Sequence, residues 1–527
     1  MSSTQVSDIW PMGDSVILLG ILAAVLTVLG AHFILQRRNH DPHPLPPSPT
    51  TWPLIGNLLS MPTENEHIGF MNLGKQLSSD IISLRMFGTT IVVLNSSEDA
   101  VNLLEKKSGI YSDRVCPVML REPSLFYWPG FITLLGYNDR WRKSRRLMHT
   151  YLHKKAAEDF HGAQQLQARL LLQRLLQKSN GLLTSEDLDL EFHGTAAATL
   201  VHSIYGYNLR SSDDPFVLGL KEAMDNGLHA ALPSSFLVNI FPALVHVPGW
   251  IPGTRWKRTA QEWRAQKDRA VDTSYNWSKE QIENGTGEPS IIASLLEHAE
   301  QLGLGDHEVD DYVKNIAVSL LAAGTDTTTN TLLVFVLAML LFPETQLKAQ
   351  EEISVVIGSN RLPTLDDRSS LPYLERLLQE VLRWCPILPG GFPHACYQDD
   401  IYKGYLIPKG AMVIPNVWAF CRNPEVYPDP TKFNPDRFLD PEVPLAPAFG
   451  YGRRSCPGIH FADSSLFIAI ASMLATFTIS PAKDSSGNKI IPPLSEGSGH
   501  VVYRPQSFKL ELKPRSQAHI DLIRAVV

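Results

Sequence analysis

The sequence has little that would support a disulfide-stabilised or nucleic-acid-binding protein. Its five cysteines, among 527 residues, are too few and too scattered for a disulfide framework or a zinc site, which is consistent with a reducing compartment. Basic and acidic residues number 47 and 54, so the net charge of −7 gives no reason to expect nucleic acid as a partner. No internal repeat and no Ser/Gly-rich tract divides the body of the chain. Although this length would ordinarily allow two or three domains, we predict one large domain.

A complete dinucleotide-binding fingerprint is also missing. Gly450-x-Gly452 lacks the third glycine and does not follow the strand that such a fingerprint requires. We therefore do not expect the chain to bind a nicotinamide or flavin dinucleotide itself.

The segment 15–35 lacks charge almost completely, since His32 is its only ionisable residue. About 20 apolar residues span a bilayer as a helix, and no Ala-x-Ala-type cleavage site follows, as a signal peptide would require. Arg37 and Arg38 follow the segment, and basic flanks stay in the cytoplasm. We predict a short lumenal N-terminus at 1–14, a single transmembrane anchor at 15–35, and a body facing the cytosol at the endoplasmic reticulum.

Proline is concentrated directly after this anchor. Five prolines fall within 41–49, which favours a stiff, extended spacer without helix or sheet. We assign 36–57 to a basic, proline-rich linker and 58–527 to the main domain. A linker with no orienting role is the alternative interpretation.

Helical periodicity dominates the main domain, so the predicted fold class is mainly α (α+β). The segment 81–94 is typical of a β-hairpin, with β-branched runs on either side of Gly88. A second strand pair is expected at 401–414, turning at 408–410, and the small sheet is expected near the N-terminal third. Predicted helices cover 156–177, 309–341, 343–357, 372–384 and 459–477.

The most informative segment is 449–458, Phe-Gly-Tyr-Gly-Arg-Arg-Ser-Cys-Pro-Gly. It places Cys456 on a glycine-bounded turn, after two arginines and before an apolar helix. Positive charge and a helix N-terminus lower the pKa of a cysteine, and the thiolate is the form that binds a metal. A lone thiolate of this kind suits an axial bond to haem iron, whereas the alternative is a buried structural cysteine.

The pattern Phe449-x-x-Gly452-x-Arg454-x-Cys456-x-Gly458 resembles the haem-binding loop of cytochrome P450 enzymes. The resemblance extends from Leu45 to the C-terminus. It implies the cytochrome P450 fold and haem b with Cys456 as the axial ligand. The segments 404–409 and 450–460 are most similar to fungal, basidiomycete-type microsomal monooxygenases of natural-product pathways, for example those that modify terpenoids.

A polar stretch, Ala323-Gly-Thr-Asp-Thr-Thr328, interrupts an otherwise apolar predicted helix. Asp and Thr compete with the backbone for hydrogen bonds inside helices, so such a stretch is expected at a functional site. By resemblance, Asp326 and Thr327 are the acid–alcohol pair that relays protons, while Ala323 and Gly324 leave room for O2. We expect a loosened helix that admits water. A water-filled kink without a proton role is the alternative.

Glu380 and Arg383 lie three residues apart on one helical face, a common arrangement in itself. By resemblance, Arg437 joins them in a structural ion-pair network under the haem loop.

Trp141 and Arg145 also share a helical face, and by resemblance they bind the haem propionates together with Arg454 and His394. For His394 a merely solvated loop histidine is the alternative. A basic cluster nearby is expected either to be solvated or to dock an acidic electron donor; it comprises Arg140, Arg142, Lys143, Arg146, Lys154 and Lys155.

Residues of the substrate pocket are inferred by position only. They carry almost no charge, which favours a small lipophilic substrate, although aromatic residues in a loop are also ordinary core residues. The candidates are Phe126, Tyr127, Trp128, Ile316, Leu320 and Leu388.

Three functions remain open from the sequence. The leading hypothesis is a haem-thiolate monooxygenase that takes electrons from an NADPH-dependent cytochrome P450 reductase. The second is a haem-thiolate isomerase or dehydratase that needs neither O2 nor reductase, although such relatives often lose the acid–alcohol pair. The third is a non-catalytic haem protein.

Overall fold

The structure, a computed structural model, describes residues 42–179, 181–211, 214–232, 235–299, 304–494 and 501–525. The predicted anchor at 15–35 lies outside these residues. The described part of the predicted linker lies against the domain, because Ser83 donates to the carbonyls of Pro46 and Pro47, and Leu406 donates to Pro44. Within the described residues, 308–341 and 459–476 are long and apolar enough to span a membrane, but both are mostly buried helices of the core.

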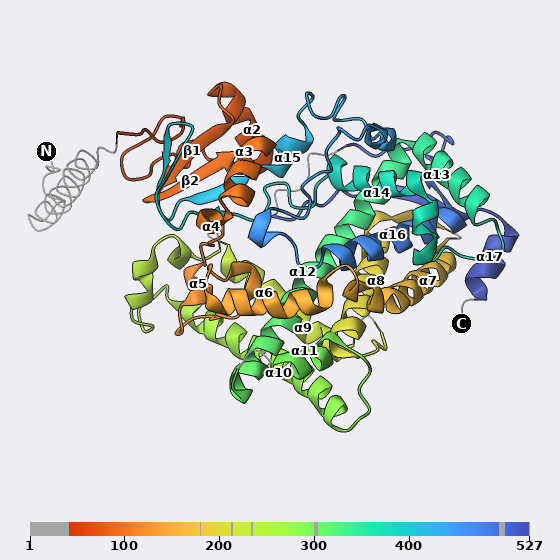
Figure 1. Cartoon of the computed structure of the whole chain (residues 1–527), viewed down its shortest axis with the longest axis horizontal. Helices are drawn as coiled ribbons and strands as arrows, with labels where there is room; N and C mark the ends of the chain where they lie inside the picture. The colour runs from red at the N-terminus through yellow and green to blue at the C-terminus, as the bar shows by residue number, and fades with distance from the viewer. Residues whose placement is uncertain are drawn as a thin grey trace, which may run out of the picture.

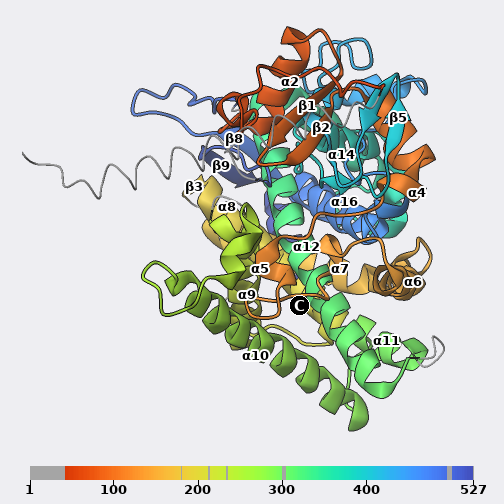
Figure 2. The same cartoon turned by 90° about the vertical axis from the view of Figure 1, so that its left-hand side faces the viewer.

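A long central helix, α12 (Asp306–Leu341), organises the helical part of the molecule (Figures 1 and 2). It packs along α8 (Ser185–Tyr205) and also contacts α16 (Ile459–Thr476). Pro343 begins the next helix. A proline disfavours helical backbone geometry in the residue before it, here Phe342, so α12 ends at Leu341. At the start of α8, Thr184 and Asp187 form a reciprocal capping box.

Most predicted helices are confirmed to within a few residues. The segment 156–177 is an exception at its start, since residues 156–160 form a 3-10 turn before α7 begins. The remaining helices of the described chain are α2 (Glu66–Gln76), α3 (Ser97–Ala100), α4 (Ser108–Tyr111), α5 (Val118–Arg121), α6 (Asp139–Leu152), α7 (His161–Lys178), α9 (Pro215–Ala231), α10 (Arg255–Glu283), α11 (Ile291–Ala299), α13 (Pro343–Val356), α14 (Pro372–Trp384), α15 (Val417–Cys421) and α17 (Gln517–Arg524).

The predicted hairpin is present as β1 (Ile81–Met86) and β2 (Thr89–Leu94), which pair in antiparallel fashion. The rest of this sheet comes from much later in the chain, because β2 pairs in parallel with β7 (Met412–Pro415), which pairs with β4 (His394–Ala395). A second sheet has the order β3 (Leu182–Thr184), β9 (Lys509–Pro514), β8 (Phe477–Pro481). The expectation of one small sheet near the N-terminal third was therefore too narrow.

The predicted strand pair at 401–414 has a different turn. The antiparallel strands are β5 (Asp400–Tyr402) and β6 (Tyr405–Ile407), and they are joined by Lys403 and Gly404, with φ of 49° and 81°. Two consecutive residues with positive φ are typical of a tight hairpin. The turn at 408–410 exists, but it leads into β7 of another sheet.

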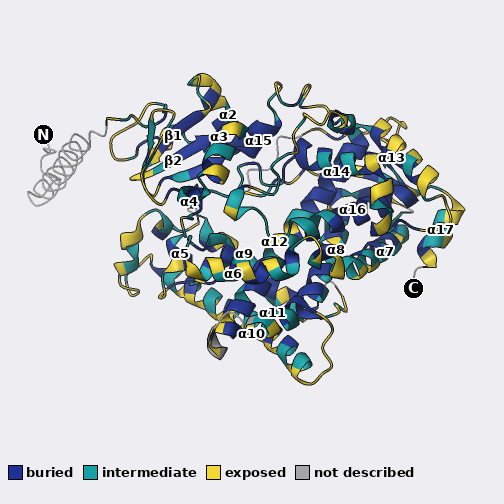
Figure 3. Ribbon diagram, viewed as in Figure 1, coloured by how far each residue is buried: buried dark blue, intermediate teal, exposed yellow. Residues whose placement is uncertain are grey.

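Two hydrophobic clusters form most of the core, and α12 contributes to both. Its residues from Val309 to Leu321 belong to one cluster, and those from Leu332 to Leu340 belong to the other. Figure 3 shows buried residues concentrated on α14 and α16, which belong to the second. The polar stretch 323–328 therefore lies where the two clusters meet.

Candidate active site

The Cys456 loop has a tightly constrained backbone. Gly450 and Gly452 have φ of 75° and 51°, and a Cβ on Gly452 would lie 2.5 Å from the carbonyl oxygen of Leu104. Glycine is therefore required there for both backbone conformation and space. The Cys456 amide donates to the Phe449 carbonyl at 2.8 Å, and α16 begins just after Gly458.

Burial dominates the electrostatics of Cys456. It raises the pKa of the thiol, while the Gly458 amide and the Arg145 guanidinium act in the opposite direction. The expected helix N-terminus and positive charge are thus present and act to lower the pKa as predicted, but desolvation of the buried thiol outweighs them. Metal coordination would have to displace the proton, as it does for cysteine ligands in general.

The guanidinium groups of Arg145 and Arg454 lie beside Trp141, and Arg114 is close enough to Arg454 to lower its pKa. The Cζ atoms of Arg454 and Arg145 lie 4.3 and 5.8 Å from the centre of the indole ring. Burial, together with repulsion from Arg114 and Arg145, lowers the pKa of Arg454 to about 9. Burial likewise lowers the pKa of Arg114 to about 10.

This positive cluster lacks matching negative charge. In the described part of the chain none of the three guanidinium groups forms a salt bridge, although Asp113 lies near enough to act on Arg114 and Arg454. The buried Nε of Arg114 has no hydrogen-bond partner. An anion with two carboxylates would satisfy these groups, so the cluster fits the two propionates of haem. Sequence analysis missed Arg114, which belongs to no recognisable motif.

His394 is buried and neutral. Burial and the nearby arginines hold its pKa well below the usual value. Its Nδ1 lies 2.7 Å from the Tyr111 carbonyl oxygen, which can only accept, so Nδ1 carries the proton. In the neutral ring Nε2 then has no proton to donate to a haem propionate. The expected hydrogen bond between His394 and a propionate would require a second proton on the imidazole, at Nε2.

The polar stretch of α12 does not open the helix, contrary to the expectation of a loosened segment. Its side chains instead bond back to carbonyls one turn earlier. Thr325 Oγ1 donates to the Leu321 oxygen at 2.9 Å, and Thr327 Oγ1 donates to the Ala323 oxygen at 2.7 Å. Ala323 is exposed, so it and Thr327 present one face that core residues do not cover.

Gly324 lies on a different face of α12. A Cβ at this position would be 2.8 Å from Cδ1 of Leu200 on α8. The missing side chain therefore allows α12 and α8 to approach closely, and the expected space for O2 at Gly324 is filled by Leu200.

Asp326 is reached by solvent. Its side chain is 63% exposed, yet the surrounding protein raises the pKa of the carboxyl by desolvation. The nearest ionisable partner is His193 of α8, whose Nε2 lies 3.8 Å from Oδ1.

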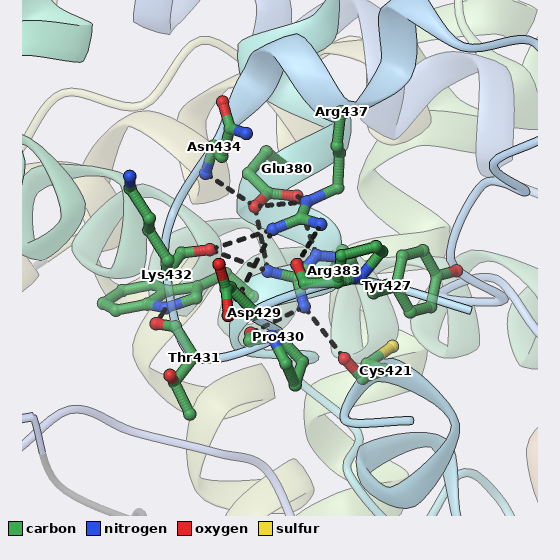
Figure 4. A network of polar contacts seen from close by, with 12 residues as sticks. Glu380, Arg383, Cys421, Tyr427, Asp429, Pro430, Thr431, Lys432, Asn434 and Arg437 are labelled. Atoms are coloured by element: carbon green, nitrogen blue, oxygen red, sulfur yellow. Dashed lines mark hydrogen bonds and ion pairs between the residues drawn. The ribbon is translucent and has the colours of Figure 1, made fainter. Parts of the chain in front are cut away.

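Glu380, Arg383 and Arg437 meet as expected, and all three are buried. The carboxylate of Glu380 accepts from Arg383 Nε at 2.7 Å and from Arg437 Nε at 3.0 Å, as Figure 4 shows. The amide of Asn434 donates to the same carboxylate at 2.8 Å. The arginines also donate to the carbonyls of Cys421 and Pro428, so the network fastens the segment 421–437 to α14.

Several predicted pocket residues are core residues instead. Phe126, Trp128 and Ile316 are buried in the same hydrophobic cluster. Tyr127 has a φ of 50°, and its ring lies 5.0 Å from the guanidinium of Arg264 on α10. Leu320 and Leu388 are partly exposed.

The basic cluster is smaller than the sequence suggests. Arg140 pairs with Asp311 of α12 at 2.6 Å, and Arg142 pairs with Asp139 at 2.6 Å. Arg146, Lys154 and Lys155 remain exposed.

Comparison with known proteins is consistent with this site. The family model described as Cytochrome P450 matches residues 46–512. Cytochrome P450 monooxygenase 208 of Postia placenta is 39% identical over 511 residues, which cover 96% of this chain and 97% of that protein. Cytochrome P450 monooxygenase claR of Ampulloclitocybe clavipes is 39% identical over 516 residues, covering 96% and 92% respectively.

Glu380→Ala should prevent stable haem incorporation, because it leaves two buried guanidinium groups without their carboxylate. Losing one partner of a buried pair typically costs about 3–5 kcal/mol. The free energy of unfolding and the haem-to-protein ratio measure the effect. Glu351→Ala, which removes an exposed carboxylate of α13, is the control. Normal haem content in Glu380→Ala would refute the structural role.

Arg114→Gln should weaken haem retention more than it destabilises the haem-free protein, because it removes a buried charge that forms no salt bridge in the described chain, although the hydrogen bonds to the carbonyls of Phe392 and Pro393 are also lost. One charge-assisted hydrogen bond contributes roughly 1.5–3 kcal/mol, so haem should leave about tenfold faster or more. Transfer of haem to apomyoglobin measures the rate. Arg114→Lys, which keeps the charge, should retain haem better than Arg114→Gln; equal rates for all three proteins would contradict the assignment.

Proposed function

The chain belongs to the cytochrome P450 family and is a monooxygenase, and from this premise we propose that it oxidises a small lipophilic compound of secondary metabolism, for example a terpenoid. The observation that carries the proposal is the uncovered face of Ala323 and Thr327 on α12, where the two hydrophobic clusters meet. On this face the hydroxyl group of Thr327 lies one turn from the small side chain of Ala323.

The cofactor would be held by groups already described. Cys456 would supply the thiolate ligand, while Arg114, Arg145, Arg454 and Trp141 would bind the propionates. Haem with a thiolate ligand, when bound, supplies O2 activation, because the thiolate favours O–O cleavage.

The roles of Asp326 and Thr327 follow from their hydrogen bonds. Thr327 Oγ1 donates its hydrogen bond to the Ala323 carbonyl, so the lone pairs of Oγ1 are free to accept a hydrogen bond from water or substrate. Asp326 has a raised pKa, which makes its carboxyl a better proton donor near neutral pH than an ordinary aspartate. Together the two side chains can hold and move protons beside Ala323.

An apolar substrate is favoured by the sequence of α12. No ionisable residue lies between Lys314 and Asp326, and Leu320 is partly exposed one turn before Ala323. A charged substrate would find no counter-charge along this part of the helix.

Electrons would come from an NADPH-dependent flavin reductase. We propose that the exposed cations Arg146, Lys154 and Lys155, with the exposed Arg453 of the Cys456 loop, help to dock it. The apolar segment 15–35 supports a single-pass anchor in the endoplasmic reticulum membrane, with the catalytic domain in the cytosol.

Co-expression with a reductase tests this function. Cells fed with lipophilic extracts of the source organism should form products that are heavier by one oxygen atom, detected by mass spectrometry, and the reduced protein with carbon monoxide should show the long-wavelength Soret band of thiolate ligation. Turnover of a hydroperoxide without NADPH would favour an isomerase or dehydratase instead.

Thr327→Ala should keep haem but release peroxide in place of product, because the hydroxyl that holds a proton beside Ala323 is lost. We expect the product formed per NADPH to fall by roughly tenfold, at the low end of general acid–base effects. Peroxide and product are both measured, and Thr327→Ser, which retains the hydroxyl, should stay close to wild type. Unaltered coupling in Thr327→Ala would exclude the relay.

Charge reversal of Lys154 and Lys155 to Glu should slow reduction by the reductase and weaken its dependence on salt, since exposed charges act mainly on association. Stopped-flow reduction under carbon monoxide measures the rate. Reduction by dithionite should be unchanged, and an unchanged reductase rate would place the docking surface elsewhere.

A further inference from the structure

His193 and Asp326 form an isolated ionisable pair between α8 and α12. Their nearest atoms, Nε2 and Oδ1, are 3.8 Å apart, and the side chains are 27% and 63% exposed. Within the described residues neither side chain hydrogen-bonds to another group. A small side-chain rotation would bring the two atoms to hydrogen-bond distance.

Charged groups from each neighbouring helix face this pair. Asp189 lies on α8, while Lys221 and Asp225 lie on α9. Asp189 is itself paired with Arg504 at 2.9 Å, whereas Lys221 and Asp225 are exposed. The helices α8, α9 and α12 thus bring ionisable groups together around His193 and Asp326.

We propose that His193 is a positioning residue that returns protons from solvent to Asp326, an inference that rests on the proposed monooxygenase function. The N–H bond at Nε2 of the imidazolium breaks as an O–H bond forms at Oδ1 of the carboxylate. The imidazole then regains a proton from water. No electrons move in this step, and each proton that Asp326 gives up is replaced by one from solvent.

The electrostatics of the pair suit this exchange. Burial lowers the pKa of His193 from its usual 6.5, and burial raises the pKa of Asp326 from its usual 3.8, so the two values approach each other. Proton transfer is most efficient between groups whose pKa values are close. A purely structural pair would instead be expected to have closer, fixed hydrogen bonds, as Glu380 has.

The first test needs no turnover. In the full-length haem-loaded protein with ¹³C-labelled histidine, NMR titration should follow the His193 signal, identified by its loss in His193→Gln. The Asp326 carboxylate raises the pKa of His193, so Asp326→Asn should lower it. The signal of His202, on the same helix and without an acidic partner in the described chain, should not move. An unmoved His193 titration would overturn the proposal.

The second test measures proton supply during O2 reduction. With a reductase and no added substrate, His193→Gln should consume NADPH about tenfold more slowly, because water alone would replace the relay, and its solvent isotope effect should be larger than that of wild type. Its rate should also depend differently on pH, which a merely structural role would not cause. His202→Gln is the matched control. A wild-type isotope effect and pH profile in His193→Gln would contradict the proposal.

The two ideas can fail separately. A wild-type protein that consumes no NADPH with any reductase would refute the proposed function, and the NMR titration would still decide whether His193 and Asp326 exchange charge. Normal wild-type turnover with an unaffected His193→Gln would refute only the relay.

Discussion

The site depends on how buried positive charge is neutralised. Buried arginines occur in two settings, one with a carboxylate partner and one without a salt bridge. Around Glu380 the guanidinium groups of Arg383 and Arg437 are matched by a carboxylate and by backbone carbonyls. Near the Cys456 loop the guanidinium groups of Arg114 and Arg454 form no salt bridge within the described residues, although Asp113 lies near enough to act on both. The first arrangement is complete in the polypeptide, whereas the second fits a ligand with two carboxylates.

The Glu380 network fastens the segment that leads toward the loop, and Arg454 within the loop donates to the carbonyls of Ser112 and Leu135. The loop is thus held at both its approach and its centre by hydrogen bonds to distant segments. Burial alone would keep the Cys456 thiol protonated. The loop would therefore favour metal binding by holding the sulfur in a fixed position, not by lowering the pKa of the thiol.

Helix α12 contributes Ala323, Asp326 and Thr327 to the site, and it does so as a continuous helix. Thr325 and Thr327 satisfy carbonyls within the helix, so the polar stretch needs no break to place hydroxyl groups among apolar residues. Gly324 brings α8 against this stretch, and with α8 comes His193. The stretch 323–328 thus accounts for two features: Gly324 allows α12 and α8 to pack closely, and Asp326 is exposed to solvent.

The sequence by itself determined the helical fold class, the β1–β2 hairpin, the loop around Cys456 and the membership of Glu380, Arg383 and Arg437 in one network. The fold class, the hairpin and the loop follow from local periodicity or from residues at fixed spacing, which a linear pattern records, whereas the place of Arg437 in the network is what the resemblance to the family implies. Only the tertiary structure decided that Arg114 completes the positive cluster, that Gly324 faces Leu200, that Phe126 and Trp128 belong to the core, and that His193 faces Asp326. Each of these contacts depends on which helices and strands, distant in the sequence, pack together. Two residues that meet in this way have no characteristic spacing in the sequence, so the sequence does not reveal the contact.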